Sequence, residues 1–482
     1  MNARDRSGFP SVRQYVAGEW REGGMGMACE VRNPATGEVL AEVPRASQQD
    51  LDDALSAASV AFDLWRFKSP QERAAVLMRT SALIRDRVED MARIMTMEQG
   101  KTLAESRMEF TLCAETFEWY AQEGLRSYGR VIPSRVRGTR QLAIPQPLGP
   151  VVAFTPWNFP ALLPARKIAP ALAAGCSVIL KPSEETPVSA LLLAQALADA
   201  GLPAGVLNMV MGVPSEISSY LIKSPIIRKV TFTGSTAVGR ELANMASVGP
   251  KPCTLELGGH APVLIFDDAD LDRTVSTCVI GKTRNAGQVC TSPTRFLVQD
   301  GIHDAFVASF AKALNTLQVG PGLDSANQMG ALANSRRLSA MESMVADTLF
   351  EGGQLKTGGK RIGERGNFFQ PTLISEVPLS AKAMHNEPFG PIALVRRFST
   401  LEDGLAAANN TPYGLAAYLF TQSAYTAATV SEELQAGGIG INTFAVSAIE
   451  APFGGLKDSG YGHEGGPEGL ESFQHMKYVH HA

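Results

Sequence analysis

The chain reads VVAFTPWNFPALLPARKIAPALAAGCSVILKP over residues 151–182, and this stretch decides the predicted fold. Two short apolar runs, 151–156 and 177–182, flank a helix-length segment at 161–174. Continuous apolar strands joined through a helix are typical of a parallel sheet that is buried on both faces. The stretch therefore predicts a strand–helix–strand unit.

The same alternation continues along the chain. Further buried strands are predicted at VLNMVMG (206–212), KVTFTGS (229–235) and APVLIF (261–266), with helices at 189–200 and 237–248. The series predicts an α/β fold with a doubly wound parallel sheet. After about residue 257 a second α/β region begins, with Gly/Pro-rich loops at NEPFGP (386–391) and APFGG (451–455).

The segments outside this sheet carry a helical pattern and a hairpin pattern. SPQE (69–72) predicts a capping box with proline at the first helical position, followed by an amphipathic helix to about Met97. Short β-prone stretches around Gly138 predict a hairpin within 128–147 that projects from the body or pairs with another subunit. The tail QHMKYVHHA (474–482) contains strand formers, and we expect it to pair with the hairpin of another subunit.

Length and composition limit the class of protein. At 482 residues two or three domains are expected, and 45% apolar with 19% charged residues is the balance of a globular enzyme. The net charge of −4, without a Lys/Arg-rich run, argues against nucleic acid or an anionic membrane surface as a partner. No apolar stretch reaches the length of about 18 residues that predicts a membrane span. The first residues, MNARDRSGFP, lack the apolar segment of a secretory signal.

The cysteines are scattered along the chain and form no CxxC pair. This pattern fits a reducing cytoplasm and argues against a clustered structural zinc site, so no metal is expected. Most are predicted to be buried small hydrophobes, because only a special environment makes a cysteine nucleophilic. The six are Cys29, Cys113, Cys176, Cys253, Cys278 and Cys290.

Two loops at predicted strand ends contain residues that suit a nucleotide. In KVTFTGSTAVGRE, Gly234 and Gly239 lie where a strand becomes a helix, and Ser235 is placed to cap that helix. Such a turn lets the backbone approach a phosphate, but a tight strand–helix loop is an equal alternative. In SVILKPSEETP, Lys181 and Glu184 follow the carboxyl end of a strand, where doubly wound sheets bind ligands. A solvated loop is the alternative for this pair.

Glu256 and Cys290 are the candidate reactive groups. In LELGGH, Glu256 is predicted to be partly desolvated, which raises the pKa of a carboxyl group and suits a general base. The alternative is a structural carboxylate that accepts hydrogen bonds from backbone N–H groups. In TRNAGQVCTSPTRF, Cys290 lies on a polar, glycine-containing loop, and a thiolate there needs donors and positive neighbours. A packed, inert cysteine is the alternative.

Together these segments resemble the aldehyde dehydrogenase superfamily along nearly the whole chain. The matching segments, in the family's order and spacing, are PWNFP (156–160), KPSEETP (181–187), FTGSTAVG (232–239), LELGGHAP (255–262), RNAGQVC (284–290), NEPFGP (386–391) and PFGGLKDSG (452–460). The resemblance implies three parts and a homodimer or homotetramer. The parts are a Rossmann-like NAD-binding domain (1–127 and 148–256), an α/β catalytic domain (257–457) and a small β oligomerisation element (128–147 and 458–482).

The resemblance also implies a mechanism and a cofactor. Cys290 would attack the aldehyde carbon, the Asn158 amide and the Cys290 backbone N–H would hold the oxyanion, and Glu256 would activate the hydrolytic water. The cofactor is NAD, with NADP as an alternative; a carboxylate at Glu184 would repel the extra phosphate of NADP. The residues implied to contact it are Thr155, Trp157, Lys181, Ser183, Glu184, Gly234, Ser235, Gly239, Glu387 and Phe389.

Two arginines suggest the kind of aldehyde. The chain is most similar to the branch that includes succinate-semialdehyde and 2,5-dioxopentanoate dehydrogenases, whose members hold a distant carboxylate with residues matching Arg166, Arg284 and Ser447. An arginine fork can donate two parallel hydrogen bonds to a carboxylate, whereas structural ion pairs are the alternative for both arginines. Phe159 and Phe453 are expected near the substrate channel, so an apolar or aromatic aldehyde stays open.

The chain departs from the succinate-semialdehyde type at Ser292, where such enzymes often have a second cysteine, so no Cys–Cys redox switch is predicted. A CoA-acylating dehydrogenase is a competing function, but those enzymes generally lack the base that Glu256 supplies. A non-enzymatic protein recruited from this fold, such as a lens crystallin, would not need Cys290, Glu256 and Asn158 together.

Overall fold

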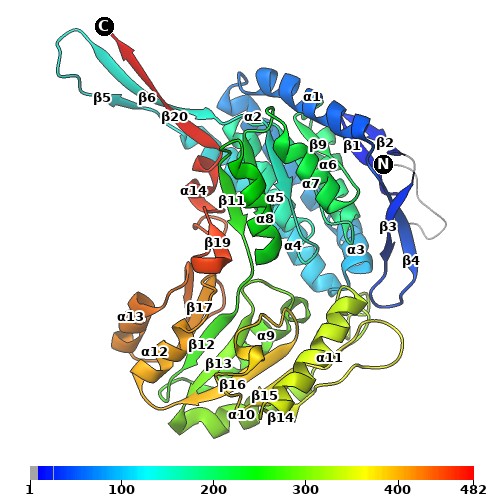
Figure 1. Ribbon diagram of the computed structural model, residues 1–482, viewed down its shortest axis with the longest axis vertical. Helices are drawn as coiled ribbons and strands as arrows, with labels where there is room; N and C mark the ends of the chain where they lie inside the picture. Colours follow the sequence, from blue (N-terminus) through cyan, green and yellow to red (C-terminus); the bar gives the residue numbers. More distant parts are fainter. Residues whose placement is uncertain (1–8, 25) are drawn as a thin grey trace.

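The computed structural model describes residues 9–24 and 26–482, so the N-terminal residues analysed for a secretory signal lie mostly outside the described part. Two α/β parts follow one another along the chain, and a three-stranded sheet projects from the first (Figure 1). No helix within the described residues is both long enough and apolar enough to cross a membrane.

The first sheet has eight strands in the order β19-β11-β10-β7-β8-β9-β1-β2. Its central strands are parallel, as predicted: β7 (Val151–Phe154), β8 (Val178–Lys181), β9 (Leu207–Met209), β10 (Lys229–Thr233) and β11 (Cys253–Glu256). Antiparallel strands at its edges are β1 (Gln14–Val16), β2 (Glu19–Arg21) and β19 (Gly460–Tyr461). These edge strands were not predicted because they are too short to show a sequence pattern.

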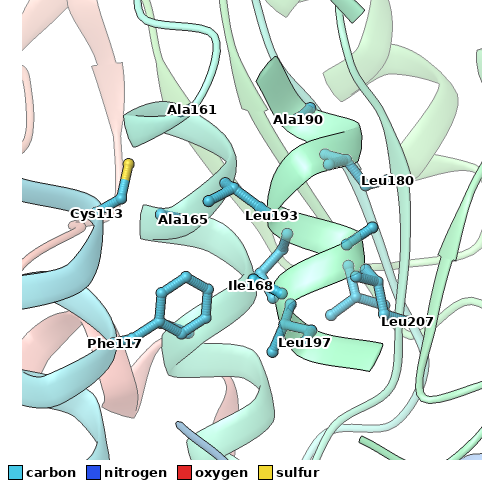
Figure 2. Packing of buried hydrophobic residues seen from close by; sticks show 14 of the residues in the cluster. Cys113, Phe117, Ala161, Ala165, Ile168, Leu180, Ala190, Leu193, Leu197 and Leu207 are labelled. Carbon is cyan, nitrogen blue, oxygen red and sulfur yellow. The ribbon is translucent and has the colours of Figure 1, made fainter. Parts of the chain in front are cut away.

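Helices pack on both faces of this sheet. Val151 and Ala153 of β7 share one hydrophobic core with α5 (Leu162–Ala174) and α6 (Pro187–Asp199). Val152 and Phe154 belong to a second core with α1 (Gln48–Trp65), α7 (Pro214–Lys223) and α8 (Thr236–Ser247). Figure 2 shows the first core, with side chains of α5 and α6 packed against each other. Alternate side chains point to opposite faces, which explains why these strands are apolar at every position.

The helix predicted after SPQE is two helices. Ser69 forms the predicted capping box with Glu72, and Pro70 begins α2 (Pro70–Asp86). The helix ends at Arg87, where ψ is 6°, and α3 (Val88–Gln99) continues beyond it. The apolar periodicity passes through this break, so the sequence pattern alone did not show it. The next helix, α4 (Leu103–Glu123), packs against α2 and α5.

The second sheet has seven strands in the order β14-β15-β16-β13-β12-β17-β18. Its strands are β12 (Ala261–Ile265), β13 (Pro293–Gln299), β14 (Gln354–Thr357), β15 (Thr372–Ser375), β16 (Ile392–Phe398), β17 (Ala416–Phe420) and β18 (Gly438–Ile441). Its helices are α9 (Leu271–Thr283), α10 (Asp300–Asn315), α11 (Ser335–Phe350), α12 (Leu401–Asn409) and α13 (Ala424–Glu433). The strand predicted at 261–266 is β12. It belongs to this second sheet, where it lies between β13 and β17. The assignment of cofactor, catalytic and oligomerisation domains stays a prediction.

The projecting sheet contains the predicted hairpin, β5 (Arg130–Ile132) and β6 (Arg140–Pro147), and the tail strand β20 (Gln474–His481). The expected pairing of the tail with another subunit is wrong, because β20 pairs antiparallel with β6 of its own chain. The preceding helix, α14 (Gly466–Glu471), ends beside β6, where the Leu148 backbone N–H donates to the Phe473 carbonyl at 3.0 Å. This contact places β20 next to β6 of the same chain, in the register of the antiparallel pair. A separate hairpin is formed by β3 (Met27–Arg32) and β4 (Val39–Pro44).

Candidate active site

The carboxyl ends of the parallel strands bring several predicted site residues to one edge of the first sheet. Thr155 follows β7, Lys181 ends β8, Gly234 follows β10 and Glu256 ends β11. The Thr155 N–H donates to the Lys181 carbonyl at 3.3 Å, and the Gly234 N–H donates to the Glu256 carbonyl at 3.0 Å. This edge is where doubly wound sheets bind ligands.

The loop that contains Cys290 has an unusual backbone. Asn285, Ala286 and Gly287 have φ values of 48°, 52° and 73°, three left-handed residues in succession. A Cβ at Gly287 would lie 2.1 Å from the Gly390 carbonyl oxygen, so only glycine fits there. Strained backbone of this kind concentrates at functional sites.

Hydrogen bonds join this loop to the turn that carries Asn158. The Asn158 side-chain amide donates to the Gln288 carbonyl at 3.0 Å, and the Asn285 amide donates to the Asn158 carbonyl at 2.9 Å. A Cβ at Gly259, three residues after Glu256, would lie 2.3 Å from the Cys290 carbonyl oxygen. The structure thus brings together the three residues predicted to be catalytic, from three segments far apart in the sequence.

Glu256 is a buried carboxyl group without hydrogen-bond partners. Its side chain is 2% exposed, and neither carboxyl oxygen has a partner among the described residues. The alternative that it anchors backbone N–H groups is therefore wrong. Desolvation raises the pKa of Glu256 well above the ordinary range, and the nearby Glu464 raises it further, whereas Lys167 lowers it.

The thiol of Cys290 has a pKa above its ordinary value. Desolvation raises the pKa of the Cys290 thiol to about 12; Glu387 and Glu256 add to this, and Arg166 and Arg284 oppose it. The positive neighbours expected from the sequence are thus present, but burial outweighs them. A group that takes up the thiol proton is needed before the sulfur can attack.

The first sheet's edge also holds the residues expected to contact an adenosine and a pyrophosphate. Lys181 Nζ lies 2.5 Å from Glu184 Oε2, and the Ser183 hydroxyl accepts a hydrogen bond from the Glu185 N–H at 3.2 Å. Ser235 caps α8, as predicted, by accepting a hydrogen bond from the Val238 N–H at 3.4 Å. These side chains make this edge of the sheet polar. The N-terminus of α8 adds the partial positive charge of its helix dipole.

Glycines at this edge allow close packing. A Cβ at Gly239 would lie 2.4 Å from Leu257, and one at Gly234 would lie 2.3 Å from the Phe232 ring. Gly239 therefore lets α8 pack closely against the Leu257 side chain, which follows β11. The hydroxyls of Thr155 and Thr233 are buried without a partner among the described residues. Thr233 was missed by the sequence analysis, because a threonine inside a strand has no distinguishing pattern.

Glu387 and Phe389 approach from the second α/β part. Glu387 Oε1 accepts a hydrogen bond from the Gly259 N–H at 3.3 Å, and burial raises the pKa of Glu387 to about 8. The Phe389 ring meets Trp157 edge-on, with ring centroids 5.4 Å apart. Arg337, which the sequence did not single out, donates to the carbonyls of Pro388 and Phe389 and so holds this loop.

The two arginines predicted to bind a substrate carboxylate each lie over an aromatic ring. The Arg166 guanidinium is 5.2 Å from the centre of the Phe453 ring and donates to the Ser447 backbone carbonyl at 2.8 Å. The Arg284 guanidinium is 5.2 Å from the centre of the Phe159 ring. Within residues 9–24 and 26–482, neither arginine forms an ion pair with a carboxylate, which contradicts the alternative of structural ion pairs.

A cavity of about 430 Å³ opens beside Phe159 and Arg284. Lys101, Glu105 and Glu109 also line it. No sequence pattern marks these residues: Glu105 and Glu109 are four apart at the start of α4, which is typical of a solvated helix face, and Lys101 precedes that helix. No group of three or more His, Cys, Asp or Glu side chains in the described part of the chain is arranged to hold a metal ion.

Comparisons with known proteins agree with this geometry. A model of the aldehyde dehydrogenase family matches residues 20–479. The chain belongs to the aldehyde dehydrogenase family. It is therefore an oxidoreductase that acts on aldehydes, and enzymes of this family use NAD or NADP. The fold and the family resemblance predicted from the sequence are confirmed.

Three aldehyde dehydrogenase relatives cover nearly the whole chain. A 4-(hydroxymethyl)benzenesulfonate dehydrogenase of Comamonas testosteroni is 48% identical over 97% of both chains. An NADP-dependent succinate-semialdehyde dehydrogenase of Escherichia coli (strain K12) is 43% identical over 96% of both chains. The solved structure of succinate-semialdehyde dehydrogenase from Burkholderia pseudomallei is 42% identical, with a TM-score of 0.96 over 100% of this chain and 99% of that one.

Proposed function

We propose that this aldehyde dehydrogenase oxidises an aldehyde with a negative charge at its far end, either succinate semialdehyde or 2,5-dioxopentanoate, to the carboxylic acid. The observation that carries the proposal is the pair Arg166 and Arg284. Both lower the pKa of the Cys290 thiol, and neither is paired with a carboxylate among the described residues. A guanidinium near a thiol that is not paired with a carboxylate of the protein suits a carboxylate on the substrate.

The chemistry begins with proton transfer from the thiol. Glu256, with its raised pKa and free oxygens, takes the Cys290 proton, and the sulfur bonds to the aldehyde carbon. The carbonyl oxygen becomes an oxyanion. It accepts hydrogen bonds from the Cys290 backbone N–H and from the Asn158 amide, which has one N–H engaged with Gln288 and a second still free.

The second half of the reaction is hydrolysis. A nicotinamide cofactor, when bound, would supply the hydride acceptor, and Cys290 would then carry the substrate as a thioester. Glu256 first releases the thiol proton to solvent and then removes a proton from water, whose oxygen bonds to the thioester carbon as the C–S bond breaks; Glu256 returns this proton to the departing sulfur. The products are the carboxylic acid and a regenerated thiol. The base therefore serves in both halves, which supports hydrolysis over transfer to CoA.

The residues at the sheet edge fit a dinucleotide. The buried Thr155 and Thr233 hydroxyls without partners are available to a ligand, and Lys181 and Glu184 suit an adenosine ribose. Ser183, Gly234, Ser235 and Gly239 would lie along the adenosine and the pyrophosphate, at the start of α8. Glu387, Phe389 and Trp157 would hold the nicotinamide half.

Glu184 is expected to favour NAD over NADP. Replacing it with glutamine removes a charge that opposes the 2′-phosphate, so the ratio of kcat/KM for NAD to that for NADP should fall about tenfold. The matched control is Glu185→Gln, because Glu185 binds Asn334 and Arg336 instead of Lys181. The ratio is measured by steady-state kinetics with both cofactors. An equal fall in the control would contradict the assignment.

The arginine pair predicts discrimination between charged and neutral aldehydes. Arg284→Ala or Arg166→Ala should raise the KM for succinate semialdehyde by about ten- to a hundredfold, because a charge-assisted hydrogen bond is lost. The KM for butanal, a neutral aldehyde of the same length, should change far less. Arg273→Ala, an exposed position on α9, serves as the control. Equal effects on both aldehydes would defeat the carboxylate assignment.

A second candidate substrate is an aromatic aldehyde with a distal anionic group. Phe159 and Phe453 lie against the two guanidiniums, so a ring and an anion could be bound by neighbouring groups. A relative that is 48% identical is named for an aromatic sulfonate. Comparing kcat/KM for succinate semialdehyde, 2,5-dioxopentanoate and 4-formylbenzenesulfonate, without CoA, separates these candidates. NADH formation without CoA also excludes the acylating alternative.

We further propose a homodimer or homotetramer in the cytoplasm. The projecting sheet exposes several large apolar side chains, which would be covered by a second copy. They are Tyr128, Val131, Val136, Met476 and Tyr478. All the cysteines are free, which is consistent with a reducing compartment.

A further inference from the structure

A buried ion pair lies behind the turn that carries Asn158. Lys101 Nζ and Glu109 Oε2 are 2.5 Å apart, and each side chain is 1% exposed. Removing two charges from water is costly, and such a pair is stable only when further hydrogen bonds satisfy its atoms. The further partners of this pair all belong to residues 158–162.

Glu109 holds the start of α5. Its second oxygen, Oε1, accepts hydrogen bonds from the Ala161 N–H at 2.9 Å and from the Leu162 N–H at 3.1 Å. The residue at the helix N-cap, Ala161, has no side chain that could do this. Glu109 therefore takes the place of a capping side chain for the helix that follows Asn158.

Lys101 holds Asn158 itself. Its ammonium group donates to the Asn158 carbonyl at 2.8 Å and lies 4.2 Å from the centre of the Phe159 ring. The same carbonyl accepts the hydrogen bond from the Asn285 amide at 2.9 Å. The backbone of Asn158 is thus fixed from two sides, while one N–H of its side chain stays free for the reaction.

Helix α4 also holds the loop that leads to Cys290. One turn before Glu109, Glu105 Oε1 accepts a hydrogen bond from the Asn285 N–H at 2.6 Å. The backbone positions of Glu105 and Glu109 are about 6 Å apart along the helix axis. A single rigid helix thereby contacts both the oxyanion turn and the nucleophile loop.

We propose that Lys101 and Glu109 are positioning residues that fix the Asn158 amide relative to Cys290. The inference rests on the proposed role of Asn158 as an oxyanion donor. A donor stabilises the transition state only when it is preorganised within about 3 Å of the developing charge. Without the pair, the turn at 158–162 loses its anchors, and the amide must be ordered during the reaction.

The test is a double-mutant cycle between Glu109→Gln and Asn158→Ala, measured with saturating NAD and aldehyde. Glu109→Gln alone should lower kcat about ten- to a hundredfold, as misplacement of a catalytic group does. The Kd for NAD and the KM for the aldehyde should stay within about twofold. In the Asn158→Ala background, Glu109→Gln should have no further effect, because the amide it positions is gone.

The matched control is Glu98→Gln. Glu98 is also buried and caps a helix start, accepting hydrogen bonds from the Val188 N–H and the Ser189 N–H of α6. This variant should lose thermal stability comparably to Glu109→Gln but keep its kcat at saturating NAD. An equal loss of kcat in the control would show that any lost helix cap lowers turnover, and would overturn the positioning role.

The outcomes separate the two proposals. If Asn158→Ala turns over at the wild-type rate, the oxyanion donor of the proposed function is wrong, and the positioning role falls with it. If Asn158→Ala is slow but the effect of Glu109→Gln multiplies with it, only the positioning role is overturned. Should Glu109→Gln fail to fold, Lys101→Met with Glu109→Gln removes both charges together and is subjected to the same cycle.

Discussion

Replacing Cys290 with alanine is expected to abolish aldehyde oxidation and leave cofactor binding intact. In the proposed mechanism the sulfur is the atom that bonds to the substrate carbon, and the methyl group of alanine cannot replace it. The loss of a nucleophile that acts together with its base lowers kcat by roughly 10⁵- to 10⁶-fold. NADH formation is followed by absorbance at saturating succinate semialdehyde, and NAD binding by fluorescence titration.

A second cysteine variant serves as control for the first. Cys253 is also partly exposed, but it lies at the start of β11, at the opposite end of that strand from Glu256. Cys253→Ala should therefore retain wild-type turnover. If Cys290→Ala still oxidised the aldehyde at a substantial rate, the assignment of Cys290 as the nucleophile would be wrong.

Replacing Glu256 with glutamine is expected to have the second largest effect. Glutamine keeps the shape of the side chain but cannot take up a proton, so both thiol activation and thioester hydrolysis lose their base. General base catalysis contributes about 10²- to 10⁴-fold, and kcat should fall by that factor. Stopped-flow and steady-state measurements of NADH together check whether both phases slow.

A strong nucleophile tests the hydrolytic part of this role. Hydroxylamine attacks a thioester without a general base, so it should restore part of the turnover of Glu256→Gln and give a hydroxamate. The absence of any rescue, with normal acylation, would show that Glu256 does not act on the water.

The pH dependence of kcat/KM of the wild-type enzyme should report the ionisation of Glu256. The base acts when it has lost its proton, so kcat/KM rises as the pH increases through the pKa of Glu256. Burial and the neighbouring Glu464 raise that pKa, so the rise should lie well above the value of about 4.3 of an ordinary glutamate. This limb of the profile should disappear in Glu256→Gln, and a profile unchanged by the substitution would assign it to another group.

Most of the first sheet could be predicted from the sequence, because its strands are short continuous apolar runs that are separated by helix-length segments. The runs at 151–156 and 177–182 became β7 and β8, and the segment at 161–174 became α5. The break at Arg87 could not be predicted, since apolar spacing is the same on both sides of it. The pairing of β20 with β6 of the same chain could not be predicted either, because the strand propensity of a segment does not specify which strand it pairs with.

The candidate catalytic residues could be predicted from the sequence, whereas the residues that hold them in place could not. Cys290, Glu256 and Asn158 were indicated by motifs, and the structure brings their segments together. Arg337, Lys101 and the α4 residues Glu105 and Glu109 were missed. Their contacts are with segments that are distant in the sequence, such as Asn158 and Asn285, and nothing in their own surroundings marks them.

The sequence by itself determined the family and the parallel sheet and indicated the candidate reactive groups, because these follow from local patterns and from motifs. Only the tertiary structure decided the states of those groups. Glu256 has a raised pKa because folding removes its carboxyl from water without giving it a partner, and the Cys290 thiol has a raised pKa because desolvation outweighs two nearby guanidiniums. Desolvation and hydrogen bonding depend on atoms contributed by distant segments, and no local pattern contains that information.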